Sequence, residues 1–488
     1  MNHPAASPVS SAGTSAMNLI NEGSAAHDVF NIERRWKAKA KTRSFCQYRY
    51  SLRFYRTVPQ ALRSFLNTPR VYPMTSRERI LAAIAHREPD RVPIDLGATP
   101  SSGISAIAYA RLRAHLGMTA GHTRVYDVVQ QLAQPEDEIL SRFKIDVIDL
   151  GRTFNTRAED WYDVRLFDGS PAQYPAWFHP TPTPEGGFKA IASDGTEIAI
   201  QLKDMNFYDQ SIFPWEDNYP ADFGKLPEAM SKVLWAALAH SPWDNANQPC
   251  FWERLRANAL ELRKQDRAVV LVIGCNLFEW GTFLRRIDNF LMDLIAEPEN
   301  VERLLEALLE IHLKTLETVC KHVGDVVDII RFGDDLGMDT GPFMSPNTYV
   351  NLFKPRHAQL CDYVHKHSSM KTFLHSCGSI HALMPHLIEA GFDVINPVQT
   401  ACFQMEADRL KADFGRDITF WGGGANTRHI LNHGSVAQVK EDVKRRLDIL
   451  APGGGFVFNT IHNILPDVPP ENIVAMYEAV EEFNGCAS

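Results

Sequence analysis

Two side chains that bind metal ions stand one position apart in the segment from Phe373 to Gly378, which reads Phe-Leu-His-Ser-Cys-Gly. Side chains alternate across an extended chain, so the imidazole of His375 and the thiol of Cys377 point to the same side. Zinc accepts both kinds of ligand in tetrahedral geometry, and three protein ligands leave one position open for chemistry. The alternative is a buried histidine beside an inert buried cysteine.

A third ligand is available at His462, near the C-terminus. Cys275 and Cys402 are alternatives to it, because each also follows a predicted strand. We predict a zinc site formed by His375, Cys377 and His462, with the identity of the third ligand left open between the histidine and these two thiols.

Eight short β-rich runs alternate with amphipathic helical stretches after residue 74, which predicts parallel strands joined by crossover helices. Eight is the number of strands in a closed (β/α)8 TIM barrel, whose active-site residues lie at the carboxyl ends of the strands. The predicted strands are Arg91–Leu96, Ile145–Leu150, Ala268–Ile273, Val327–Phe332, Met370–His375, Asp393–Val398, Ile418–Trp421 and Gly455–Asn459.

The connection over residues 152–267 is too long for one crossover. Alternating residues on both sides of Asp194-Gly195 predict a β-hairpin within it. We therefore predict an α/β barrel, residues 74–488, with a β-containing cap inserted at about 152–267. The clearest predicted helices are Arg77–Ala85 with Ser76 as its N-cap, Pro298–Lys321, Ser435–Leu450 and Pro470–Phe483.

Polar residues follow each predicted strand, and in a barrel they converge on one pocket. We predict catalytic roles for Asp335 and Glu279, in orienting a substrate or supplying a proton. The alternative for Asp334-Asp335 is a capped turn after a strand. Residues predicted to bind substrate are Asp95, Asp149, Asp334, Asn396, Gln399 and Asn426.

The composition excludes several classes of protein. A net charge of −9 gives no reason to expect a nucleic-acid partner. No uninterrupted apolar run reaches the roughly 18 residues that a membrane span needs. The eight cysteines show no paired framework, which indicates a reducing, cytoplasmic compartment.

Residues 1–73 differ in composition from the rest of the chain. They begin with a stretch rich in serine, alanine and glycine and then become basic, with Glu33 the only acid nearby. This pattern is typical of an organelle transit peptide. We predict that these residues form an N-terminal extension, disordered or translated from a start upstream of the natural one at Met74, with the transit peptide as the alternative.

Several segments together resemble the uroporphyrinogen decarboxylase superfamily over residues 74 to 485, and within it the branch of corrinoid-linked methyltransferases. The chain lacks the arginine pair by which the decarboxylases hold a substrate with many carboxylates: it has Arg91-Val92-Pro93-Ile94-Asp95-Leu96-Gly97 there. The segments that carry the resemblance are Thr75–Arg79, Pro89–Pro93, Phe332–Gly337, Met344–Pro346, Leu374–Ile380, Asn396–Gln399, Gly453–Gly455 and His462–Ile464.

The resemblance implies zinc-dependent transfer of a methyl group between a small methylated substrate or thiol and a corrinoid (cobalamin). No corrinoid-binding motif is visible, so the corrinoid is expected on a partner protein, and the resemblance is compatible with a homodimer. The methyltransferases carry a cysteine where this chain has His462, which favours transfer from a methylated donor to the corrinoid. The alternatives are a decarboxylase that uses Asp95 or Asp149 at a pyrrole, and a non-catalytic binder of a corrinoid or tetrapyrrole.

Overall fold

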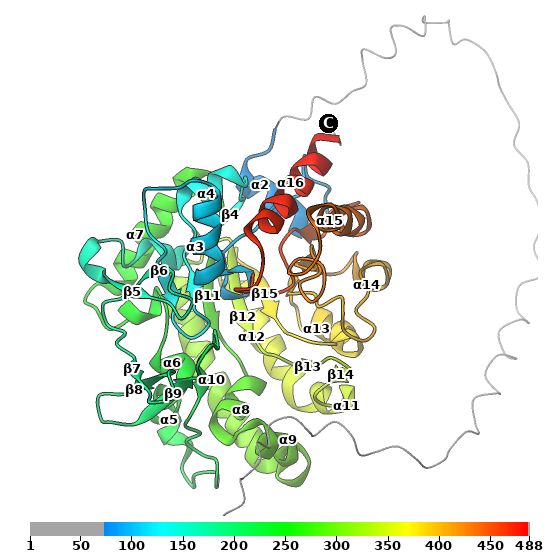
Figure 1. Cartoon of the computed structure of the whole chain (residues 1–488). Helices are drawn as coiled ribbons and strands as arrows, with labels where there is room; N and C mark the ends of the chain where they lie inside the picture. Colours follow the sequence, from blue (N-terminus) through cyan, green and yellow to red (C-terminus); the bar gives the residue numbers. More distant parts are fainter. Residues whose placement is uncertain (1–72, 487–488) are drawn as a thin grey trace, which may run out of the picture. The chain divides into compact units, whose positions relative to one another are not determined.

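A parallel sheet of seven strands, in the order β18-β17-β16-β15-β12-β11-β4, forms the centre of a computed structural model that describes residues 73–486 (Figure 1). All neighbouring strands in it are parallel, as crossover connections require. The strands are β4 (Val147–Asp149), β11 (Ala268–Gly274), β12 (Ile329–Gly333), β15 (Lys371–His375), β16 (Val394–Asn396), β17 (Thr419–Trp421) and β18 (Phe456–Val457).

The segment around Ile94 joins the two edges of this sheet. On one side, Phe458 N donates to Pro93 O over 2.8 Å and Asp95 N donates to Phe458 O over 2.9 Å. On the other side, Asp146 N donates to Ile94 O over 2.9 Å. The predicted α/β barrel is confirmed, and its first predicted strand, Arg91–Leu96, is shortened to a single bridge at Ile94.

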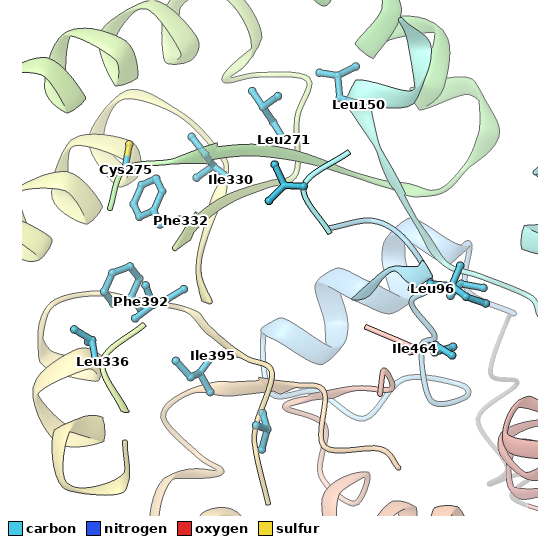
Figure 2. Packing of buried hydrophobic residues seen from close by; sticks show 14 of the residues in the cluster. Leu96, Leu150, Leu271, Cys275, Ile330, Phe332, Leu336, Phe392, Ile395 and Ile464 are labelled. Atoms are coloured by element: carbon cyan, nitrogen blue, oxygen red, sulfur yellow. The ribbon is translucent and has the colours of Figure 1, made fainter. Parts of the chain in front are cut away.

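Strand alternation divides the apolar residues into two layers. Val270, Val272 and Phe373 belong to a cluster inside the barrel, together with Ile80 of helix α2 (Ser76–Ile84). The intervening residues face the surrounding helices, and Figure 2 shows Leu271 beside Ile330, its partner in the register of β11 and β12. Helix α2 therefore closes the interior with the same kind of side chains that fill it.

Helices follow the strands and cover the outside of the sheet (Figure 1). Each buries the apolar side of an amphipathic pattern. They are α3 (Ala106–His115), α7 (Phe251–Leu262), α10 (Pro298–Val323), α12 (Lys354–His367), α13 (Met384–Glu389), α14 (Ala407–Phe414), α15 (Val436–Leu450) and α16 (Pro470–Cys486). No helix within residues 73–486 combines the length and apolar character that crossing a membrane would need.

The N-cap predicted for the first helix is wrong by one residue. Thr75 caps α2: its Oγ1 accepts from Glu78 N over 3.2 Å, and Thr75 N donates to Glu78 Oε2 over 2.9 Å. This reciprocal capping box satisfies two terminal N–H groups, which Ser76 cannot do from inside the helix.

Between β4 and β11 the chain forms small antiparallel sheets and short helices. Strands β5 (Trp161–Arg165) and β6 (Pro171–Pro175) pair with each other. A second sheet has the order β10-β9-β8-β7, and β8 (Phe188–Ile191) and β9 (Glu197–Gln201) form the hairpin predicted around Asp194-Gly195. The predicted N-terminal extension, residues 1–73, lies outside the described residues apart from Pro73.

Aspartates stand directly before three of the barrel strands and bind the neighbouring strand. A carboxylate oxygen of Asp146 accepts from Ile94 N over 2.9 Å. Asp328 likewise accepts from Val269 N over 3.0 Å, and Asp393 accepts from Thr372 N over 2.9 Å. Each aspartate fixes the start of one strand against the next, at the amino-terminal end of the barrel.

Cations balance these buried carboxylates. Asp146 Oδ1 lies 2.6 Å from Arg79 Nη1 and 2.7 Å from Arg91 Nη2. Asp328 pairs in the same way with Arg77 and Arg263, at 2.8 and 2.9 Å. The charged residues in the first two segments of the family resemblance thus close the barrel rather than bind substrate.

Replacing Asp146 with alanine removes the buried carboxylate shared by Arg79 and Arg91, although Arg79 keeps its pair with Asp90, and we expect the free energy of unfolding to fall by roughly 3 kcal/mol. Urea denaturation followed by circular dichroism measures the change. The matched control is Asp362→Ala, which removes an exposed pair with Lys366 and should cost less than about 1 kcal/mol. Equal losses in the two variants would contradict this role of Asp146.

Candidate metal and substrate site

The three predicted metal ligands lie together at the carboxyl end of the barrel. His375 ends β15, Cys377 follows it by two residues, and His462 lies in the loop after β18. His375 Nε2 is 3.4 Å from Cys377 Sγ, and the His375 and His462 rings are 5.3 Å apart between centroids. One potential ligand atom from each of the three residues lies within 4.8 Å of the other two.

This spacing fits zinc. An ion held tetrahedrally about 2.1 Å from nitrogen and about 2.3 Å from sulfur separates those two ligand atoms by about 3.6 Å. The observed 3.4 Å between His375 Nε2 and Cys377 Sγ is close to that value. The donor atoms, two imidazoles and one thiol, are also those that zinc prefers.

Asn396 fixes the tautomer of His375. The Asn396 Nδ2 group donates to Trp421 O over 2.8 Å, so its Oδ1 atom faces His375 as an acceptor. His375 Nδ1, 2.7 Å from that oxygen, must therefore carry the proton. The lone pair on Nε2 is left free on the side of Cys377, as a metal-binding histidine requires.

Burial keeps the ligands uncharged when no metal is bound. It lowers the pKa of His375 to about 3, with the nearby Arg331 acting in the same direction. It raises the pKa of the Cys377 thiol well above its usual value, and the carboxyl groups of Asp335 and Glu279 add to this. Binding of zinc must then release the thiol proton, so zinc affinity should fall as the pH falls.

The turn after β15 holds Cys377 in place. Gly378 has φ +86°, and a Cβ atom there would come within 2.2 Å of the Gly337 backbone. Cys377 N donates to Asp335 Oδ1 over 2.8 Å, and Gly378 N donates to the side-chain oxygen of Gln399. Glycine is required here both for its backbone conformation and for the close approach.

The two alternative thiols lie apart from this group. Cys275 is buried and lines the neighbouring cavity, but it is not part of the cluster. Cys402 Sγ donates to Asp339 Oδ1 over 3.3 Å. Within the described part of the chain, the ligand atoms that gather to metal-binding distance are those of His375, Cys377 and His462.

A cavity of about 390 Å³ adjoins the metal ligands. His375, His462 and Asp335 line one part of it. Apolar residues of the long insertion and of α8 (Phe278–Arg285) line another part: Met230, Trp235, Trp243, Trp280 and Phe283. The volume falls in the range of sites for small molecules, roughly 300–1,000 Å³.

Both predicted catalytic residues line this cavity. Asp335 Oδ1 is 3.5 Å from His375 Nε2. Burial raises the pKa of Glu279 well above its usual value, and the negative charges of Asp335 and Asp334 add to this. This shift favours the protonated form of Glu279, which can donate a proton.

The six residues predicted to bind substrate support the site from outside the cavity. Asp334 accepts from Phe278 N over 3.0 Å and Glu279 N over 2.8 Å, and so caps α8. Asn396 and Gln399 hold His375 and Gly378, as described. Asp95 accepts from Ala98 N and Trp421 Nε1, Asp149 accepts from Gly151 N, and Asn426 accepts from Arg428 N and His429 N. None of the six is among the residues that line the cavity.

The polar residues of the cavity that were missed from the sequence include Asp127, His240 and Arg331. Asp127 ends the short strand β2 (Val125–Asp127) and His240 lies in a loop of the long insertion, and no spacing pattern marks either residue. Arg331 did give a signal, because it is a charged residue in an apolar strand, two positions from Gly333 on the same face. A strict count of strand alternation would have placed it inside the barrel.

The metal site predicts the outcome of three substitutions. Cys377→Ala and His462→Ala should each abolish stoichiometric zinc, whereas Asn396→Ala should retain it with an affinity about 10- to 100-fold weaker. Metal analysis and competition with a chelator measure these effects, and Cys402→Ala is the control that should bind zinc normally. Full zinc content in His462→Ala would remove that residue from the ligand set.

The burial of Asp149 can be tested by measuring how the stability of the protein depends on pH. Burial raises its pKa from 3.8 to about 7, so the folded protein holds a proton that the unfolded chain releases above about pH 4. The stability contribution of this group is present in acid and is lost as the pH rises from about 4 to 7. Asp149→Asn should remove that loss and gain as much as roughly 4 kcal/mol over the parent protein by pH 8. Urea denaturation at several pH values decides, since a difference independent of pH would contradict it.

Comparison with known proteins supports the interpretation of fold and family. Residues 278–483 match the family model described as uroporphyrinogen decarboxylase (URO-D). A methyltransferase from Methanosarcina mazei has a similar structure, with a TM-score of 0.52 and 17% sequence identity over 84% of this chain and 99% of that one. At this identity the likeness establishes the fold alone.

Two curated relatives carry different activities in their names. The methylcobamide:CoM methyltransferase MtaA of Methanosarcina barkeri is 26% identical over 160 residues, which are 32% of this chain and 42% of that protein. A uroporphyrinogen decarboxylase of Geobacter metallireducens is 22% identical over 218 residues, 44% of this chain and 57% of that protein. The chain thus spans about half the length of these relatives. The family match over residues 278–483 and these relatives agree with the resemblance to the uroporphyrinogen decarboxylase superfamily that the sequence predicted.

Proposed function

We propose that this protein is a zinc-dependent methyltransferase, which moves a methyl group between a small methylated donor or thiol and a corrinoid held by a partner protein. The observation that carries the proposal is the trio of His375, Cys377 and His462 beside a cavity of small-molecule size. The relative named a methylcobamide:CoM methyltransferase supports the same branch.

Zinc held by the trio would act as a Lewis acid toward an oxygen or sulfur atom of the substrate. The protein prepares for this by presenting His375 Nε2 without a proton, through the bond from Nδ1 to Asn396. It also holds the thiol of Cys377 in a turn fixed by Asp335 and Gln399. The substrate would occupy the adjoining cavity, against its aromatic wall.

Glu279 favours transfer from a methylated donor toward the corrinoid. In that direction the bond from oxygen to the methyl carbon breaks, and the reduced corrinoid supplies both electrons of the new bond to carbon. The freed oxygen then needs a proton, which Glu279 holds because burial raises its pKa. Transfer to a thiol instead requires a base, which a protonated Glu279 does not provide.

The decarboxylase alternative fits the cavity less well. A tetrapyrrole with many carboxylates needs several cations, and Arg331 is the one arginine or lysine among the residues that line this cavity. Asp127 and Asp335 line it as well and would repel further carboxylates. Asp95 and Asp149, the residues that this alternative needs beside the pyrrole, are outside the lining.

The test is methyl transfer from a panel of methoxyarenes to free cob(I)alamin, with the zinc-loaded and the zinc-depleted protein compared. We expect methylcobalamin to form only with zinc, and Glu279→Gln to lower kcat by about 10²- to 10⁴-fold without loss of zinc. The control is Glu253→Gln, an exposed residue of α7. Release of CO₂ from uroporphyrinogen by the zinc-depleted protein would favour the decarboxylase instead.

A further inference from the structure

Arg331 places an unpaired cation in the cavity. It lies on β12 opposite Phe373 of β15, on the face that looks into the barrel. Its side chain makes no hydrogen bond or ion pair with any residue between 73 and 486, and its Nε atom is buried without a partner. An arginine keeps its charge even when buried. The carboxyl groups of Glu279 and Asp335 act on the guanidinium without forming an ion pair with it, so its hydrogen-bond donors can pair with an anionic ligand.

Gly333 makes room for this guanidinium. A Cβ atom at position 333 would lie 2.9 Å from Arg331 Nη1 and 3.0 Å from Asn276 Nδ2. The interior position that a side chain would fill is thus left to the end of Arg331. Gly333 pairs with His375 in the register of β12 and β15. The end of Arg331 therefore lies at the same height in the barrel as His375.

The two acids near Arg331, Asp335 and Glu279, form hydrogen bonds with other groups. Asp335 accepts from Cys377 N over 2.8 Å, and Glu279 accepts from Asn276 Nδ2 over 2.5 Å. Neither forms an ion pair with Arg331. The guanidinium therefore keeps its hydrogen-bond donors for a ligand.

We propose that Arg331 binds the single carboxylate of the methylated substrate, and that this substrate is a small methoxylated aromatic acid. This inference rests on the proposed function and names its substrate class. The planar guanidinium matches a carboxylate through two parallel hydrogen bonds. Trp243, Trp280 and Phe283 in the same cavity provide apolar surfaces for a ring between the carboxylate and the metal ligands.

The charges of the cavity limit the substrate to one carboxylate. The other ionisable groups in the lining, apart from histidines and the Cys275 thiol, are Asp127, Glu279 and Asp335. A second carboxylate would lie near Asp127 and Asp335 without a partner cation, which costs more than one charge-assisted pair returns. A neutral methoxyarene would leave Arg331 unpaired.

The experiment compares 4-methoxybenzoate with anisole, the same methoxylated ring without the carboxylate. Both are titrated into the zinc-loaded full-length protein by calorimetry. We expect 4-methoxybenzoate to bind at least tenfold more tightly than anisole. Arg331→Met should abolish that preference and leave the affinity for anisole unchanged, whereas the control Arg157→Met, an exposed arginine paired with Asp160, should keep it.

Zinc content and thermal stability separate substrate binding from a structural role. Arg331→Met should retain one zinc per chain and melt at the same or a higher temperature, because it removes an unpaired buried charge. Loss of zinc in this variant would assign Arg331 to the metal site and overturn the proposal. The unsubstituted protein alone can also overturn the proposal. It would do so by binding 4-methoxybenzoate and anisole equally, or by not binding 4-methoxybenzoate at millimolar concentration.

The binding assay uses no corrinoid, so the two proposals can fail separately. A carboxylate preference that depends on Arg331, without methyl transfer, would overturn the proposed function and leave this assignment standing. Methyl transfer from neutral donors, without a carboxylate preference that depends on Arg331, would support the proposed function and overturn the assignment of Arg331.

Discussion

The barrel depends on strand register, and buried aspartates set that register. Asp146, Asp328 and Asp393 each accept a backbone N–H group from the neighbouring strand at the amino-terminal end. A slip of one residue between strands would turn every side chain to the opposite face. At the other end, the same register places His375 beside both Gly333 and Asn396. The orientation of the metal ligand therefore follows from contacts made at the far end of the strands.

The two ends of the barrel satisfy their polar groups differently. At the amino-terminal end, cations and carboxylates are matched in buried pairs, and α2 closes the interior with apolar side chains. At the carboxyl end, Arg331 forms no hydrogen bond or ion pair with the described residues 73–486, and His462 adopts φ +63°, which is uncommon outside glycine. Such departures from local rules concentrate at functional sites, where the rest of the structure must stabilise them.

The sequence was sufficient for the barrel and for bringing His375, Cys377 and His462 together, because both follow from periodicity, and their binding of a metal stays a prediction. Alternation placed His375 and Cys377 on one side, and the strand count placed His462 near them. The direction of individual side chains was not predictable in the same way. Asp334 and Asn396 stand at strand ends as expected, but Asp334 turns to the start of α8 and Asn396 to His375. Part of the aromatic lining, Trp235 and Trp243, comes from an insertion whose packing against the barrel no local pattern encodes.

Gly333 has a consequence for how related proteins diverge. The guanidinium of Arg331 fits in the cavity because Gly333 of β12 has no side chain. An alanine there would crowd Arg331 Nη1 and Asn276 Nδ2, and its Cβ atom would not touch His375, Cys377 or His462. Preference for a charged or a neutral molecule can thus change through one methyl group on the barrel interior, with the reaction centre intact. Substitutions that change which molecule binds can therefore accumulate separately from substitutions at His375, Cys377 and His462.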